Sequence, residues 1–244
     1  IGFAAGNTNA AFTLTATPLW AAQPFTPEQE VRIKALIRET LIANPDILEQ
    51  SVNAWQQQAN EAQDTQLNQL IAANKKALYE DPGSPRFGAA KPVLTIVLFT
   101  DYNCPFCKIF DPLLEKLVQE YPQVAVVLKP LPFKGESSVT SARVALTLWQ
   151  QHPDQFMAFH QRLMAKKGFH DTSSIASAQK ITGVTPVESS EQSLTVLRSN
   201  LKLAEQLGVQ GTPATLIGDQ MVPGAISYEQ LEAIVKQQLA QAEK

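Results

Sequence analysis

The stretch Asp101-Tyr102-Asn103-Cys104-Pro105-Phe106-Cys107 contains the only two cysteines of the 244-residue chain. A near-continuous apolar run from Val93 to Phe99 comes just before it and predicts a strand that is covered on both faces. The residues from Asn103 to about Tyr121 predict a helix, and Val124 to Leu128 predict a second buried strand. Strand, helix and strand in this order predict a βαβ unit with parallel strands, and they place the cysteines where the first strand meets the helix.

This position gives the cysteine pair a chemical meaning. Cys104 is expected at the helix N-terminus, where free backbone N–H groups and the helix dipole stabilise a thiolate, the nucleophile of disulfide exchange. Cys107 follows one turn later, close enough to resolve a mixed disulfide. Pro105 suits the first helical turn because its missing N–H would have no helical partner. A bridge between the two cysteines closes too short a loop to staple a fold of this size, so its value lies in chemistry.

Zinc sites use the same cysteine spacing, but they usually need two further ligands. The chain has no other cysteine, and its three histidines, His152, His160 and His170, show no ligand spacing. We therefore expect no metal site and no dissociable cofactor.

Two further motifs accompany the cysteine stretch: Lys129 followed by Leu131-Pro132, and Gly208-Val209-Gln210-Gly211-Thr212-Pro213. Together they resemble the thioredoxin superfamily, and within it the DsbA-like periplasmic thiol-disulfide oxidoreductases. The resemblance implies that Pro213 is a cis-proline facing the active site, with Thr212 exposing backbone groups to an extended substrate. The alternative is an ordinary trans turn.

The resemblance also implies the fold class. The expected protein is α/β, a thioredoxin fold with an inserted helical subdomain, preceded by an N-terminal helical oligomerisation segment. The catalytic domain is expected over residues 81–244, with the insertion at about residues 137–207. A short strand at residues 214–217 and a final amphipathic helix from Ser227 complete the pattern.

One position departs from the family pattern. Members commonly carry a buried carboxylate six residues before the first cysteine, and Leu98 stands there. The proton of the second thiol then has Lys129, Asp101 or water as candidate acceptors. Asp101 as a solvated turn residue and Lys129 as a surface charge remain alternatives. Phe106 replaces the His of the strongest oxidants and cannot donate a hydrogen bond to the thiolate, so we expect a less oxidising couple.

The region before residue 81 predicts two helices. Thr26-Pro27-Glu28-Gln29 has the pattern of a capping box, and the helix should end before Asn44-Pro45. A second helix is expected from Asp46 to about Tyr79. Its single apolar stripe consists of Leu48, Val52, Trp55, Ala59, Ala62, Leu70, Ala73 and Ala77. A polar helix with one narrow apolar face favours self-association, and the alternative is that it folds back on its own domain.

This segment, residues 26–80, resembles the helices of trimeric DsbA-like proteins of the suppressor-of-copper-sensitivity C and BcfH type. A homotrimer is therefore the favoured oligomer. Residues 1–25 carry no charge and end near Ala21-Ala22, which resembles the end of a secretory leader. The alternative is a cloning remnant or an unstructured arm. We expect a periplasmic protein, secreted through a cleaved leader, without membrane insertion.

The expected reaction is dithiol-disulfide exchange on protein or peptide substrates, with an unidentified redox partner. Disulfide isomerisation with some oxidase or reductase activity is favoured, because oligomers of this family place several active sites around a shared cleft. A net charge of −3 gives no reason to expect nucleic acid as a partner. The alternative function is a copper-binding or copper-resistance module that uses the two thiolates to hold Cu(I).

Overall fold

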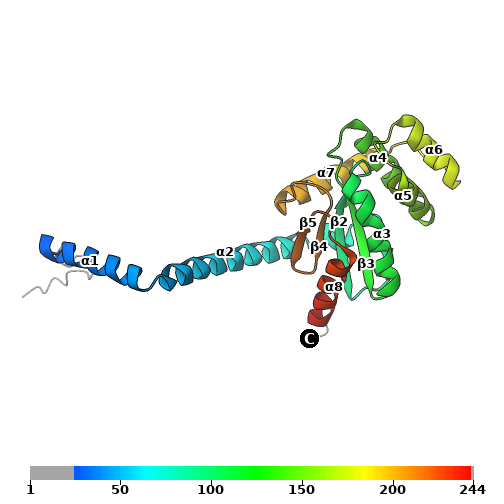
Figure 1. Cartoon of the computed structure of the whole chain (residues 1–244). Coiled ribbons are helices and arrows are strands. Elements are labelled where there is room, and N and C mark those ends of the chain that lie inside the picture. Colours follow the sequence, from blue (N-terminus) through cyan, green and yellow to red (C-terminus); the bar gives the residue numbers. More distant parts are fainter. Residues whose placement is uncertain (1–24, 243–244) are drawn as a thin grey trace, which may run out of the picture. The chain divides into compact units, whose positions relative to one another are not determined.

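A computed structural model of the chain describes residues 25–242, and the unit from Asn60 onward is built around a five-stranded mixed sheet (Figure 1). The strand order is β1-β3-β2-β4-β5. Only β2 and β3 run parallel, and the other neighbours are antiparallel. The strands are β1 Arg86–Gly88, β2 Leu94–Thr100, β3 Val124–Pro130, β4 Ala214–Ile217 and β5 Gln220–Pro223. The predicted parallel pair is thus confirmed as the middle of the sheet.

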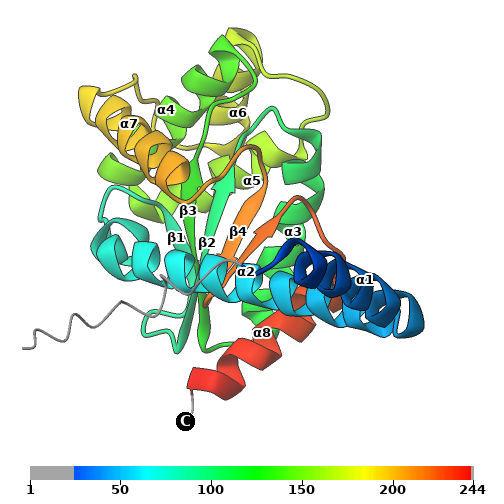
Figure 2. The same ribbon diagram turned by 90° about the vertical axis from the view of Figure 1, so that its left-hand side faces the viewer.

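Strand β2 is covered on both faces, as its apolar run predicts. Leu94, Ile96 and Leu98 belong to a large core cluster with residues of α3 (Pro105–Glu120) and α8 (Tyr228–Ala242). Val97 and Phe99 point to a second cluster with residues of α7 (Glu191–Gln206). Figure 2 shows α7 on the face of the sheet that this second cluster covers. Burying each such side chain contributes about 1.5–3 kcal/mol before entropy is counted.

The expected helical insertion lies between β3 and β4. Four helices form it. Among them α4 (Glu136–Gln151), α5 (Phe156–Ala165) and α6 (Thr172–Thr182) contact one another, and Figure 1 shows them grouped together. A short 3₁₀ turn, Pro153–Gln155, separates the first two, and α6 and α7 are capped by the side chains of Asp171 and Ser190. The fourth helix of the insertion is α7.

The two N-terminal helices follow the predicted pattern at their starts. Helix α1, Pro27–Ala43, begins with the Thr26–Gln29 capping box and ends before Asn44. Helix α2, Asp46–Ala73, ends earlier than expected, and a π turn, Lys76–Glu80, takes over. Leu78 within this turn is completely buried. The π turn thus carries Leu78 into the core, whereas the predicted polar helix was not expected to bury a side chain there.

The contacts divide the chain into two compact units between Ala59 and Asn60. The expected apolar stripe of α2 is divided as well. Val52 and Trp55 are exposed, whereas Leu70 and Ala77 pack against the second core cluster. The prediction of one oligomerisation stripe from Leu48 to Ala77 is therefore wrong for its last part, because those side chains meet the sheet of their own unit. The expected segment boundaries at residues 25 and 80 stay predictions.

Residues 1–24, where the uncharged arm or leader is expected, lie outside the described residues. Among the described helices, none combines the length and the apolar character that crossing a bilayer requires.

Candidate active site

Cys104 is the N-cap of α3. Its backbone is extended (φ −81°, ψ 119°), and its N–H donates to the carbonyl of Asp101 at 3.0 Å. The side chain is nearly buried, and its Sγ donates to the backbone carbonyl of Thr212 at 3.2 Å. A thiolate at this place faces the unpaired N–H groups of the first helical turn and the positive end of the helix dipole. The local sequence pattern predicted this position correctly.

Cys107 lies one turn deeper and is 1% exposed. Burial raises the pKa of its thiol to about 12, and the hydrogen bond with Cys104 adds to the rise. The hydroxyls of Thr100 and Thr212 and a backbone hydrogen bond with Asp101 act in the opposite direction. Both hydroxyls are buried and have no hydrogen-bond partner of their own, so they are free to turn toward the sulfur whose pKa they lower. The protein thus keeps this thiol protonated while placing two donors beside it.

Thr100 is a site residue that the sequence analysis missed. It is the last residue of β2 and is 1% exposed. Its position directly before the cysteine stretch is the signal that could have identified it, because a strand end in this fold faces the start of α3.

The Thr212–Pro213 peptide is cis, as the resemblance implied. A cavity of about 340 Å³ lies beside it, lined by residues 208–214 and by the β5 residues Met221 and Pro223 with Gly224. Phe106 is 62% exposed and Pro105 is exposed as well, so the dipeptide between the cysteines faces the surface. A substrate would therefore approach the buried dithiol past the exposed Pro105 and Phe106 side chains, next to the Thr212 carbonyl and this cavity.

Comparison with known families shows which family has this fold and this pair of cysteines. The model of the DSBA-like thioredoxin domain matches residues 95–236, more than half of the chain. The chain belongs to the DsbA-like thioredoxin family. A second model, the N-terminal domain of the copper resistance protein ScsC, matches residues 29–62 and makes the chain a DsbA-like protein of the ScsC type. The resemblance drawn from the sequence is confirmed.

Individual relatives agree with this assignment. A periplasmic thioredoxin-like protein from Salmonella enterica serovar Typhimurium is 58% identical, with a TM-score of 0.67, over 68% of this chain and 95% of that one. ScsC of Proteus mirabilis in a transitional conformation is 50% identical, with a TM-score of 0.70, over 89% of this chain and 100% of that one. Disulfide bond formation protein D of Bacillus subtilis (strain 168) is 23% identical over 64% of this chain and 78% of that protein. The chain is thus a thiol-disulfide oxidoreductase.

Asp101 of this DsbA-like chain is a buried structural residue. Its Oδ1 accepts from the Asn103 N–H at 2.9 Å and the Ser138 hydroxyl at 2.7 Å. Its Oδ2 accepts from the N–H groups of Phe133 and Lys134 at 2.9 and 3.0 Å. The alternative of a solvated turn residue is wrong, because these four donors hold the carboxylate between the cysteine loop and the start of the insertion. Its role as a proton acceptor stays a prediction.

Lys129 is also buried, at 1% exposure, so the surface-charge alternative is wrong. Its Nζ donates to the carbonyl of Ala77 at 2.5 Å and to the Ser84 hydroxyl at 2.8 Å, and lies 3.6 Å from the Asp81 carboxylate. Burial lowers the pKa of the ammonium group, and the charge of Asp81 opposes that shift. These contacts tie β3 to residues 77–84. Transfer of a proton from Cys107 to Lys129 stays a prediction.

Leu98 occupies the place of the usual family carboxylate and is buried in the main core cluster. It pairs across the sheet with Thr215, whose buried hydroxyl has no hydrogen-bond partner. The strand pair therefore offers a hydroxyl but no carboxylate in this DsbA-like core.

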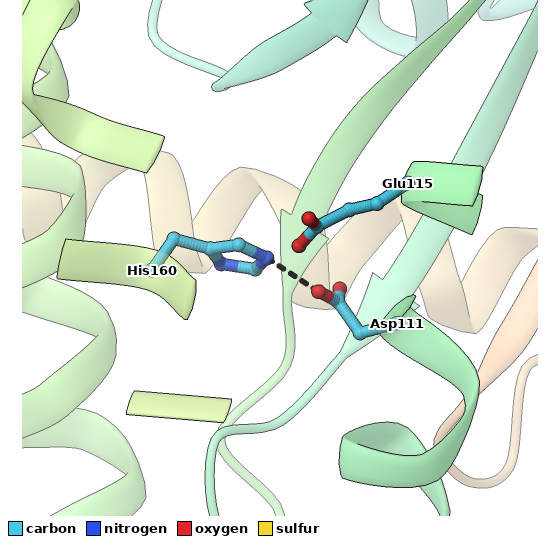
Figure 3. A group of neighbouring side chains, drawn as sticks. All are labelled: Asp111, Glu115 and His160. Carbon is cyan, nitrogen blue, oxygen red and sulfur yellow. Dashed lines mark hydrogen bonds and ion pairs between the residues drawn. The ribbon is translucent and has the colours of Figure 1, made fainter. Parts of the chain in front are cut away.

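Asp111, Glu115 and His160 form a side-chain cluster that the sequence analysis did not anticipate (Figure 3). His160 hydrogen-bonds through Nε2 to Asp111 Oδ2 and through Nδ1 to the Tyr102 hydroxyl, both at 2.9 Å. Glu115 Oε2 accepts from Gln161 at 2.7 Å. Burial raises the pKa of the Glu115 carboxyl, and the hydrogen bond from Gln161 opposes the rise. The i, i+4 spacing of the two acidic residues was visible, but the approach of His160 depends on helix packing.

Proposed function

We propose that this protein is a disulfide isomerase of protein substrates, with some oxidase or reductase activity, that works as a periplasmic homo-oligomer. The observation that carries the proposal is the unequal pair of thiols. Cys104 stands at a helix N-terminus beside the Thr212 carbonyl, while Cys107 is buried behind it with a pKa raised to about 12.

The exchange begins when the Cys104 thiolate attacks one sulfur of a substrate disulfide. A bond forms between Cys104 and that sulfur, and the second substrate sulfur leaves as a thiolate. The Thr212 carbonyl and the adjacent cavity support a substrate chain laid along residues 208–214. Two routes then release the enzyme: Cys107 attacks Cys104, or another thiol of the substrate attacks its own bonded sulfur.

The buried thiol favours the second route. With a pKa of about 12, on the order of 10⁻⁵ of Cys107 is thiolate at pH 7. An exposed substrate thiol with a pKa of ~8.5 is about 3% thiolate at the same pH. Attack by the substrate thiol moves the disulfide to a new position and returns Cys104 as a thiolate, which is isomerisation. Attack by Cys107 leaves a reduced substrate and an oxidised enzyme.

Self-association through the N-terminal helices supports the same activity. Neither α1 nor α2 has a buried side chain, and their exposed apolar residues are Val31, Leu36, Ile37, Ile42, Ile47, Leu48, Val52 and Trp55. Burying such a set against partner copies would supply the missing apolar contacts. Joined active sites hold a substrate through repeated exchanges by raising the effective thiol concentration. A trimer is favoured by the resemblance of residues 26–80 to the helices of trimeric DsbA-like proteins, and the match of residues 29–62 to the ScsC N-terminal domain supports that resemblance.

Cys107→Ser tests the proposed division of labour. The variant should lose net oxidation and reduction of a small disulfide substrate, yet keep much of the refolding of scrambled ribonuclease in a glutathione buffer. Cys104→Ser should lose both activities. If Cys107→Ser lost refolding as completely as Cys104→Ser, release by Cys107 would be obligatory and the proposal of a substrate-resolved isomerase would fail.

A second candidate function is metal handling by the same dithiol. The match of residues 29–62 to a domain of a copper resistance protein favours it, and two neighbouring thiolates suit a soft ion such as Cu(I). Insulin reduction and ribonuclease refolding should be measured with and without Cu(I). High affinity for Cu(I) in a protein without exchange activity would favour the metal-handling function.

A further inference from the structure

The cluster of Asp111, Glu115 and His160 brings three potential metal ligands together from two helices. Asp111 and Glu115 lie one turn apart on α3, and His160 comes from α5 of the insertion. One donor atom from each residue lies within 4.8 Å of the others. Figure 3 shows the two carboxylates and the imidazole turned toward a common point. The fold, rather than the sequence spacing, creates this arrangement.

Within the described structure, the buried carboxylate of Asp111 lacks a hydrogen-bond partner for one of its two oxygens. Asp111 is 1% exposed, and its Oδ1 has no hydrogen-bond partner. An unsatisfied buried acceptor costs about 1–3 kcal/mol, and more if it is charged. The nearby ammonium group of Lys108 is engaged elsewhere, because it donates to the carbonyls of Lys166 and Gly168 at 2.6 Å each. A bound cation would satisfy the free carboxylate oxygen.

The outer partners of these residues also suit a metal site. Metal-bound histidines usually hydrogen-bond through their second nitrogen, and that contact fixes the ring. The Tyr102 hydroxyl takes this place at 2.9 Å from His160 Nδ1. Gln161 holds the Glu115 carboxylate in the same way at 2.7 Å. Two of the three ligands are therefore oriented by neutral side chains.

A cavity of about 260 Å³ borders the cluster and is lined by Lys108, Asp111, Pro112, Glu115, Gln161, Met164 and Ala165. It offers an entry path and room for a water ligand. Three protein ligands with one open position are typical of Zn²⁺ sites outside closed structural ones. Donor atoms at 2.0–2.2 Å from a tetrahedral ion lie roughly 3.3–3.6 Å apart. The ion would therefore replace the 2.9 Å hydrogen bond between His160 Nε2 and Asp111 Oδ2, and a movement of the half-buried Glu115 side chain would complete the site.

We propose that Asp111, Glu115 and His160 bind one divalent transition-metal ion of the Zn²⁺ type, at a site separate from the Cys104–Cys107 dithiol. One imidazole nitrogen and two carboxylate oxygens suit Zn²⁺, Mn²⁺ or Co²⁺ better than the soft Cu(I), which prefers sulfur. The ion ties α3, which carries both cysteines, to α5 of the insertion. Through the His160–Tyr102 hydrogen bond it also holds the loop that leads to Cys104. This bracing of α3 against α5 does not depend on the proposed isomerase activity.

The test uses the full-length chain with Cys104→Ser and Cys107→Ser, because free thiolates would bind zinc themselves. After treatment with a chelator, titration with Zn²⁺ alone in a calorimeter should show one ion per chain. A hundredfold excess over the dissociation constant should raise the melting temperature by roughly 5–10 °C. Co²⁺ in the same protein should give a visible spectrum without sulfur charge-transfer bands.

Variants assign the site. Tyr102→Phe keeps the ring and removes only the orienting hydroxyl, so the affinity for Zn²⁺ should fall about 10- to 100-fold. Glu115→Gln should weaken Zn²⁺ binding at least as much. Because Glu115 is partly exposed, this variant should still fold. His160→Gln should abolish the stoichiometric binding. Glu229→Gln and His152→Gln, which alter an exposed acid and a histidine outside the cluster, should bind Zn²⁺ like the parent.

Two outcomes would overturn the proposal. One is a folded parent that shows neither one-to-one binding nor a rise in melting temperature, in which case a proton rather than a cation joins the carboxyl groups. The other is stoichiometric binding that Glu115→Gln and Tyr102→Phe leave unchanged, which would place the ion elsewhere.

Discussion

The helices before Ala59 and the unit from Asn60 onward use apolar residues in opposite ways. Helices α1 and α2 have no buried side chain, and Trp55 is 66% exposed. The second unit buries three clusters of apolar residues on and around the sheet, including Leu78 at 0% exposure. The difference teaches that the second unit buries its apolar residues within itself, whereas the first leaves them exposed, which is the basis of the proposed self-association.

The largest expected effect comes from removing the first unit. A chain that begins at Asn60 should be a folded monomer that retains simple dithiol exchange. It should lose about 10²–10⁴-fold of its refolding activity on scrambled substrates, because linked sites raise effective concentration by such factors. Light scattering and scrambled ribonuclease measure the two properties.

A chain that begins at Asp81 is the matched control for the position of the cut. It loses Leu78 and the Ala77 carbonyl that accepts from Lys129, so it should also be less stable toward denaturant. A monomer starting at Asn60 with undiminished refolding activity would leave α1 and the part of α2 before Asn60 as a tether or docking arm.

The second prediction compares one apolar side chain from each unit. Leu78→Ala should lower the free energy of unfolding by about 2–5 kcal/mol, because it leaves a cavity in a packed cluster. Trp55→Ala should change the unfolding of the catalytic unit by less than about 0.5 kcal/mol, since the side chain is exposed. It should instead weaken self-association. Equal destabilisation by the two changes in chemical denaturation would contradict the comparison.

The third prediction concerns pH, since the second unit buries a thiol. Burial raises the folded-state pKa of Cys107 to about 12, above the ~8.5 of an unfolded chain. Between these values the unfolded state releases the proton first, so the stability of the reduced protein should fall as pH rises. The expected loss is about 1.4 kcal/mol for each pH unit above 9.

Cys107→Ala provides the reference for this pH dependence, measured by urea denaturation from pH 8 to 10.5 under reducing conditions. In that variant, the free energy of unfolding should no longer show this additional decrease with rising pH. Parallel curves for the two proteins would show that the buried thiol is not the source.

The smallest expected effect comes from one hydroxyl beside that thiol. Thr212→Val keeps the side-chain shape and removes a donor that lowers the pKa of Cys107. Resolution by Cys107 should then slow several-fold and the mixed disulfide should live longer, with a change in stability below about 1 kcal/mol. Stopped-flow measurement of mixed-disulfide decay checks this, and Thr100→Val is the matched variant. Unchanged decay in both would make the two hydroxyls bystanders.

Local patterns predicted much of this protein. The βαβ unit, the capping box at Thr26 and the position of Cys104 were all visible in short stretches, because strand burial and helix capping depend on neighbouring residues. The cis peptide before Pro213 followed from the family resemblance. The end of α2 was predicted less well, since the burial of Leu78 depends on a sheet that begins later in the chain.

The sequence by itself determined that Cys104 stands at the start of α3, since a cysteine after a buried strand and before a helix meets that helix's N-terminus whatever surrounds it, and a helix N-terminus favours a thiolate. Only the tertiary structure decided the partners of the buried polar groups. Asp101 gained donors from residues 133–138, Lys129 gained acceptors from residues 77–84, and His160 reached Asp111 across 49 positions. Such contacts depend on how helices pack on the sheet, and packing joins residues whose separation in sequence carries no periodic signal.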